Sequence, residues 1–232
     1  MKRTFLFCIS VAIIQLSFAQ MDMATGNLAT SQVYSVHGRL STGFVESFKT
    51  GSPFFEKDWM NSNLTLVDGK EIKGVKTKIN LLTNEVYYLN KNNEYVSDSP
   101  IKEIILLDEA DKEKYRFVNF AYMNLADKKQ ADGWYLEDIS GPVSLYKKVE
   151  KIIEESKQYG SATTERSIKT DTKYVVLHNY ALTELNKLKD VYNVLYDKKT
   201  ELEKYGQAEK LQKPSGEAYR KLIGYYNSLV AK

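Results

Sequence analysis

The chain has 232 residues with 33 basic and 30 acidic side chains, so its overall charge favours neither nucleic acid nor any other strongly charged partner. Its 43% hydrophobic residues, 27% charged residues and 4 prolines are typical of a folded globular protein and exclude a disordered or coiled-coil chain. These values define a structural class and point to no activity.

The N-terminus has the three regions of an export signal. Lys2 and Arg3 precede an apolar run at residues 5–14, and small residues then stand at the positions that a signal peptidase reads. We therefore predict a signal peptide that is cleaved between Ala19 and Gln20. The apolar run is shorter than the about 20 residues of a membrane span. No later segment reaches that length, so we expect a periplasmic or secreted protein without a transmembrane span.

The only cysteine, Cys8, lies inside the predicted signal peptide and has no small-residue pair before it that would mark a lipid attachment site. The mature chain therefore contains no cysteine. We expect it to be held by an ordinary hydrophobic core without disulfide bonds. Thiol catalysis and thiolate metal sites are excluded for the same reason.

We expect residues 20–50, which are rich in Ser, Thr and Gly, to form a lead-in segment with one strand near 32–36. Residues 51–178 are predicted to be β-rich, because turn-forming clusters separate apolar runs of strand length. Such runs occur at 86–89, 101–107, 115–120, 134–136 and 174–177. The alternation at residues 143–153 favours a long strand, although four of its apolar residues could also line a helix.

The clearest local signal is a β-hairpin at residues 64–73. Two strand-like runs flank the dipeptide Asp68-Gly69, which accepts the positive φ angles of a primed turn. Over residues 75–81 apolar and polar side chains then alternate, as in a strand with one face exposed to solvent. A meander of antiparallel strands follows from this pattern.

From Leu182 onward the spacing of apolar residues becomes helical. Leucines and tyrosines recur at steps of three and four residues as far as Gly206, which predicts one amphipathic helix. Pro214 and Ser215 predict the start of a second helix that runs to the chain end. Two helices cannot bury their own apolar stripes, so we expect them to pack on the sheet, with another subunit or a partner as the alternatives.

The predicted fold class is therefore α+β: an antiparallel sheet or roll of the meander type, followed by a C-terminal amphipathic helical hairpin. We expect one domain, with a second domain beginning near Asn179 as the alternative. The predicted segments are a signal peptide at 1–19, the lead-in at 20–50, the β-rich region at 51–178 and the helical hairpin at 179–232.

The string from Ile104 to Asp111 matches the acidic box of the DEAD-box RNA helicases. Those enzymes also need a phosphate loop of the form Gly-x4-Gly-Lys-Ser/Thr, and none of the 12 glycines begins such a spacing. The same acids do not match the calcium-loop pattern, because Ala110 and Lys112 stand where further oxygen ligands would be needed. We therefore interpret the string as a strand that runs into a solvent-exposed acidic turn.

Other catalytic signatures are missing. His37 and His178 are too few for a three-histidine zinc site, and neither belongs to an H-E-x-x-H motif. There is no Gly-x-Ser-x-Gly elbow. We expect no metal and no cofactor. The missing signatures favour the interpretation that the protein is not an enzyme. Glycoside hydrolysis by paired carboxylates stays open, because the separation of two carboxylates is spatial and one sequence does not show it.

Aromatic residues are the one compositional excess, with 17 tyrosines, 9 phenylalanines and 2 tryptophans. Exported proteins can bind sugars on exposed aromatic rings, and the candidates for such glycan or ligand contacts are Trp59, Trp134 and Tyr135. The alternative is core packing, because strands favour aromatic residues.

Several segments together resemble the small exported proteins of Bacteroidota-type cell envelopes. They are 18–20, 51–55, 79–81, 86–88, 133–135, 143–146 and 225–227. The likeness covers most of the mature chain, and it lies in the spacing of strands and turns. It implies an envelope location and assigns no activity.

We therefore expect a non-enzymatic protein that binds or supports another envelope component, with no nucleic-acid partner. The candidate partner surface is the helical stripe of Tyr219, Leu222 and Tyr226. A carbohydrate-binding module or a carboxylate-based glycan hydrolase is the alternative. A small ligand held between the sheet and the helices is a third hypothesis.

Overall fold

The computed structural model describes residues 36–41, 48–127, 132–157 and 164–231. The predicted signal peptide, with its cleavage site between Ala19 and Gln20, lies outside the described residues. Most of the lead-in segment also lies outside the described residues. Of the strand expected near 32–36, only Val36 is described.

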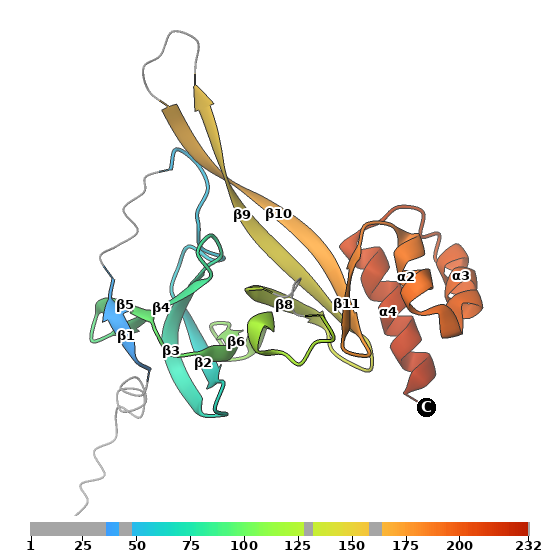
Figure 1. Ribbon diagram of the computed structural model, residues 1–232, viewed down its shortest axis with the longest axis horizontal. Helices are drawn as coiled ribbons and strands as arrows, with labels where there is room; N and C mark the ends of the chain where they lie inside the picture. The colour runs from blue at the N-terminus through green and yellow to red at the C-terminus, as the bar shows by residue number, and fades with distance from the viewer. Residues whose placement is uncertain (1–35, 42–47, 128–131, 158–163, 232) are drawn as a thin grey trace, which may run out of the picture.

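The described residues form one antiparallel sheet of 11 strands (Figure 1). Its order is β1-β5-β4-β3-β2-β6-β7-β8-β9-β10-β11, so two meanders run outward from β2 in opposite directions. The strands are β1 (Gly38–Leu40), β2 (Met60–Leu66), β3 (Glu71–Asn80), β4 (Glu85–Asn90), β5 (Asn93–Ser97), β6 (Ile101–Leu107), β7 (Glu113–Asn119), β8 (Trp134–Ile139), β9 (Ser144–Lys157), β10 (Thr164–His178) and β11 (Ala181–Leu185). The predicted antiparallel sheet is confirmed, and so is the hairpin around Asp68-Gly69, which joins β2 to β3.

The first part of the sheet curls on itself. Three residues join Ser97 of β5 to Ile101 of β6, and this link can span at most about 14 Å. In the sheet order, β4, β3 and β2 lie between these strands, which would separate them by about 19 Å in a flat sheet. The sheet from β5 to β6 must therefore bend into a roll, and one buried cluster fills it, including Leu64, Ile79 and Trp134.

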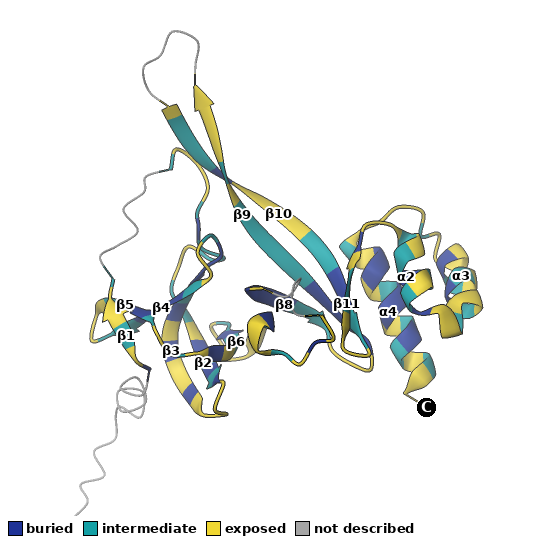
Figure 2. Cartoon of the chain, in the orientation of Figure 1, coloured by how far each residue is buried: buried dark blue, intermediate teal, exposed yellow. Residues whose placement is uncertain are grey.

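Strands β9 and β10 form a long arm that projects beyond the rest of the sheet (Figure 1). They pair without a register shift from Ser144↔Leu177 to Lys157↔Thr164. The strand expected at residues 143–153 is thus confirmed, and the helical alternative is wrong for this segment. Figure 2 shows that the end of β9 is exposed, that the facing part of β10 is mostly intermediate in burial, and that the base of the arm is buried beside the helices.

A strap at residues 48–55 ties this arm to the roll. Thr50 forms a parallel bridge to Ser167 of β10, and Phe54 forms an antiparallel bridge to Asn80 at the end of β3. The ring of Phe55 then packs edge-on against Phe117, with centroids 4.8 Å apart. The strap therefore ties the outer part of the arm to the roll.

The C-terminal region differs from the expected hairpin of two helices. Residues 181–185 form β11, which pairs with β10 from Tyr174↔Leu185 to His178↔Ala181. The helices that follow in the described residues are α2 (Leu188–Val194), α3 (Lys199–Ala208) and α4 (Gly216–Val230), with the 3₁₀ turn η2 (Tyr196–Lys198) between α2 and α3. The helix expected from Leu182 to Gly206 therefore begins later and is interrupted.

Local contacts explain where these helices begin. The carboxylate of Asp190 accepts hydrogen bonds from the backbone N–H groups of Asn186 and Lys187 at 2.8 and 2.7 Å, which fixes the start of α2. The start of α4 is the one expected: the hydroxyl of Ser215 accepts a bond from the N–H of Ala218 at 3.1 Å. The helices cover one face of β8–β11. The short helix η1 (Phe120–Tyr122) and the residues after it pack on the opposite face.

Candidate functional site

An open cleft of about 720 Å³ lies where β2 begins and β6 ends. Trp59, one of the aromatic residues expected to contact a ligand, is partly exposed on its wall. The other lining residues are Glu56, Asp58, Met60, Asn61, Lys76, Leu107, Asp108, Glu109, Ala110 and Lys114. The cleft is open to solvent along one side, so a ligand can reach it from the surface.

The strap positions Trp59. The backbone N–H of Phe55 donates to the carbonyl of Ile79, and the N–H of Leu81 donates to the carbonyl of Pro53, both at 2.9 Å. The chain therefore enters β2 already aligned with β3. Above the indole ring, Lys78 Nζ lies 4.7 Å from the ring centroid, which is within cation–π distance.

Another part of the lining is the acidic turn after β6, which lies beside the start of β2. Strand β6 ends at Leu107, and one oxygen of Asp108 accepts bonds from the N–H groups of Ala110 and Lys112, both at 2.9 Å. Asp111 adopts a positive φ of 56°, which reverses the chain. The interpretation of this string as a strand that runs into a solvent-exposed acidic turn is confirmed. What the sequence did not reveal is that this turn and Trp59 line the same cleft.

The cleft combines one aromatic ring with charged groups and an amide. Four carboxylates, those of Glu56, Asp58, Asp108 and Glu109, outnumber the ammonium groups of Lys76 and Lys114. Such a wall accepts hydrogen bonds from hydroxyl or amine donors, while the indole offers apolar area. Among the described residues, no group of three or more His, Cys, Asp or Glu side chains is placed to hold a metal ion.

The other two aromatic candidates lie in the interior. Trp134 is 3% exposed inside the roll, where its Nε1–H donates to the carbonyl of Asn84 at 3.2 Å. Tyr135 is 1% exposed, and its ring stacks on Phe120 with centroids 4.0 Å apart. Burial raises the pKa of Tyr135. Both rings contribute packing, and neither offers a face to a ligand at the surface.

The helical stripe expected to face a partner packs inside the molecule. This stripe of α4 is buried against the other helices and the sheet, and it consists of Tyr219, Leu222 and Tyr226. The hydroxyl of Tyr219 donates to the carbonyl of Leu185 at 3.1 Å, which ties α4 to β11. The sheet therefore takes up the apolar face that a partner could otherwise have used.

A second polar cluster, which the sequence did not predict, surrounds Arg116. The guanidinium of Arg116 on β7 pairs with Glu103 of β6 at 2.9 Å, Glu113 at 2.6 Å and Glu137 of β8 at 3.5 Å. These residues line an open pocket of about 620 Å³ together with Tyr146 of β9. Strand register brings them together across four neighbouring strands. No local sequence signal marked the cluster, because its charged residues come from separate strands.

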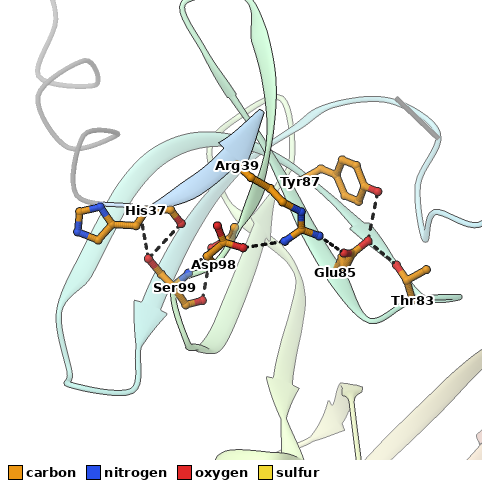
Figure 3. A network of polar contacts seen from close by, with 8 residues as sticks. His37, Arg39, Thr83, Glu85, Tyr87, Asp98 and Ser99 are labelled. Carbon is orange, nitrogen blue, oxygen red and sulfur yellow. Dashed lines mark hydrogen bonds and ion pairs between the residues drawn. The ribbon is translucent and has the colours of Figure 1, made fainter. Parts of the chain in front are cut away.

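A third network fastens the edge strand β1 (Figure 3). Arg39 donates to Asp98 at 2.7 Å and to Glu85 at 2.5 Å, and Glu85 also accepts a bond from the hydroxyl of Thr83 at 2.9 Å. The hydrogen bond to Asp98 is the largest cause of the raised pKa of Arg39. His37 takes part through its backbone, whose N–H donates to the hydroxyl of Ser99 at 2.9 Å. This network explains the position of β1 without any ligand.

The second histidine also has a packing role. The ring of His178 lies edge-on to that of Tyr226, with centroids 6.1 Å apart, near the end of β10. The hydroxyl of Tyr226 in turn donates to Asp197 at 3.1 Å. His178 does not line the Trp59 cleft or the Arg116 pocket.

Comparisons with protein-family models, curated proteins and solved structures found no match to this chain. In the part of the chain that the structure describes, no helix is both long and apolar enough to cross a membrane.

Proposed function

We propose that this chain is an exported, non-enzymatic protein of the cell envelope, and that it binds a glycan-like envelope component in the Trp59 cleft. The observation that carries this proposal is the position of Trp59, the one tryptophan at the surface, in a cleft that it shares with a turn rich in carboxylates. The export signal and the resemblance to envelope proteins support the location.

The chemistry of the cleft suits a ligand that carries both apolar faces and hydroxyl groups. A sugar ring can lay its C–H face on the indole of Trp59 while its hydroxyls donate to Asp108 and Glu109. The amide of Asn61 and the ammonium of Lys76 add donors in the same cleft. A few placed polar groups around an aromatic surface are typical of small-molecule sites.

Binding is favoured over hydrolysis by the arrangement of the carboxylates. A glycosidase needs two carboxyl groups on either side of the scissile bond. In the Arg116 pocket, Glu103, Glu113 and Glu137 all turn oxygen atoms toward one guanidinium. In the Trp59 cleft, one carboxylate oxygen of Asp108 accepts hydrogen bonds from the backbone of its own turn. The glutamates of the Arg116 pocket are therefore engaged with one cation, and are not placed as such a catalytic pair.

The test is a glycan microarray, together with sedimentation of the chain from Gln20 onward with insoluble peptidoglycan. We expect retention that Trp59→Ala reduces at least tenfold. The matched control is Tyr196→Ala, which removes an exposed ring outside the cleft. Retention by Trp59→Ala equal to that of the unchanged protein would exclude the cleft as the site. Turnover of any retained glycan would contradict the non-enzymatic proposal.

A further inference from the structure

In the outer half of the arm, one edge of β9 pairs with no other strand of the described residues. Strand β8 pairs with β9 only as far as Leu136↔Lys147, and β9 continues to Lys157. From Val149 to Lys157, no described residue forms a backbone hydrogen bond on the side of β9 that faces away from β10. Unpaired strand edges of this length can template pairing with another strand.

The strap shows which residues point their backbone groups to that edge. The N–H of Lys49 donates to the carbonyl of Arg166, and the N–H of Ile168 donates to the carbonyl of Thr50, both at 2.9 Å. Arg166 and Ile168 therefore point their backbone groups away from β9. In an antiparallel ladder, the residues of a pair share this orientation, so their partners point theirs away from β10. These partners are Glu155 and Ile153.

By alternation, Val149, Lys151 and Lys157 also direct their backbone N–H and C=O groups to the free edge. The arm presents this edge in an ordered form, because side chains join its two strands. Glu155 pairs with Arg166 at 3.2 Å, and Lys151 donates to the hydroxyl of Thr170 at 3.0 Å. On the far edge of β10, the strap already occupies the backbone of Arg166 and Ile168. The β9 edge is thus the side of the outer arm that is open.

We propose that the β9 edge of the arm pairs with the β9 edge of a second copy of this chain, around a two-fold axis at Ile153. In this register, Lys151 lies opposite Glu155 of the second copy, and the two-fold symmetry repeats this pair. Ile153 meets its own copy at the centre. No like charges lie directly opposite each other between Val149 and Lys157.

The charge pattern selects this register among the neighbouring ones. A two-fold axis at residue 150, 151, 154 or 155 places a charged residue opposite its own copy. An axis at Ile152 places Glu150 opposite Glu154 of the second copy. Like charges directly opposite each other destabilise a strand pair. The edge is short compared with the area of a stable dimer interface, so we expect a weak dimer that depends on concentration.

The test uses reciprocal charge reversal in the chain from Gln20 onward, followed by sedimentation equilibrium. We expect the unchanged chain to form dimers as its concentration rises, and Lys151→Glu and Glu155→Lys each to weaken dimerisation at least tenfold. An equimolar mixture of the two variants should restore it, because each axis-related pair is then again of opposite charge. Lys169→Glu, a charge reversal on β10, is the matched control and should leave dimerisation unchanged.

A cysteine reports the axis directly and does not depend on the charge variants. The chain from Gln20 contains no other cysteine, so Ile153→Cys should form a disulfide-linked dimer under mild oxidation. Thr170→Cys, on β10, should link far more slowly. Circular dichroism checks that each variant is folded. A monomer at every concentration, a mixture that associates no better than its components, or equal linking of both cysteine variants would each overturn the proposal.

Discussion

Lys78 Nζ lies 4.7 Å from the ring centroid of Trp59 and 5.5 Å from that of Phe54, so one ammonium group joins two aromatic rings beside the cleft. Both rings belong to the segment that leads into β2, whereas Lys78 belongs to β3. This contact holds the indole in place before a ligand arrives, which lowers the entropic cost of binding.

Replacing Lys78 by Met keeps the apolar stem and removes the charge. We expect Trp59 to become more mobile and its fluorescence to be quenched more strongly by acrylamide, while stability falls by about 0.5–1 kcal/mol. Trp134 is buried and should contribute a constant, weakly quenched signal. Identical quenching of the variant and the unchanged protein would show that the ammonium does not restrain the ring.

Leu222→Ala should reduce the free energy of unfolding by about 2–5 kcal/mol, because it leaves a cavity in the core between α4 and the sheet. Leu222 is 0% exposed, whereas Leu40, the control for the same substitution, is 62% exposed. Urea denaturation of both variants measures the difference. A loss at Leu222 as small as that at Leu40 would mean that the helices do not pack tightly on the sheet.

Stability should fall as the pH rises above about 10. Burial, reinforced by the nearby Glu137, raises the pKa of Tyr146 to about 12 from its ordinary value of 10.0. Between these values the unfolded chain loses this proton and the folded chain keeps it, so the unfolded state is favoured as the pH increases. Over the whole window this amounts to at most about 3 kcal/mol.

Urea denaturation at pH 9 and pH 11 tests this dependence, with Tyr146→Phe as the control. The variant has no phenol to ionise, so its stability should decline less over the same interval. Other buried tyrosines, such as Tyr87 and Tyr219, also have raised pKa values and should account for part of the remaining decline. An equal decline in both proteins would contradict the role of Tyr146.

Asp190→Ala should destabilise the fold by about 1 kcal/mol, because it removes the acceptor for two backbone N–H groups at the start of α2. Asp190→Asn keeps an oxygen acceptor and should recover most of this loss. Thermal unfolding followed by circular dichroism distinguishes the two variants. Equal melting temperatures for Asp190→Ala and the unchanged protein would show that the cap contributes nothing.

Much of the fold could be predicted because its signals are local. Asp68-Gly69 predicted a turn from its own backbone preferences, and Ser215 predicted the start of α4 from its ability to accept a bond from an N–H within the same turn. Strand β11 could not be predicted in this way. Leu182 and Leu185 are three residues apart, which fits a helix, and pairing with β10 overrides this preference. Asn179 and Tyr180, both with positive φ, form its turn without glycine.

The sequence by itself determined the alternation of strands, the turn chemistry and the charge pattern along β9, because these depend on neighbouring residues. Only the tertiary structure decided which aromatic rings are exposed. The curl of the sheet buries Trp134, whereas Trp59, which follows the strap, lies at the surface in the same cleft as Asp108. The glutamates around Arg116 meet for a similar reason, since strand register joins residues that are distant in the chain. Contacts of this kind depend on how the whole sheet bends, which no local pattern encodes.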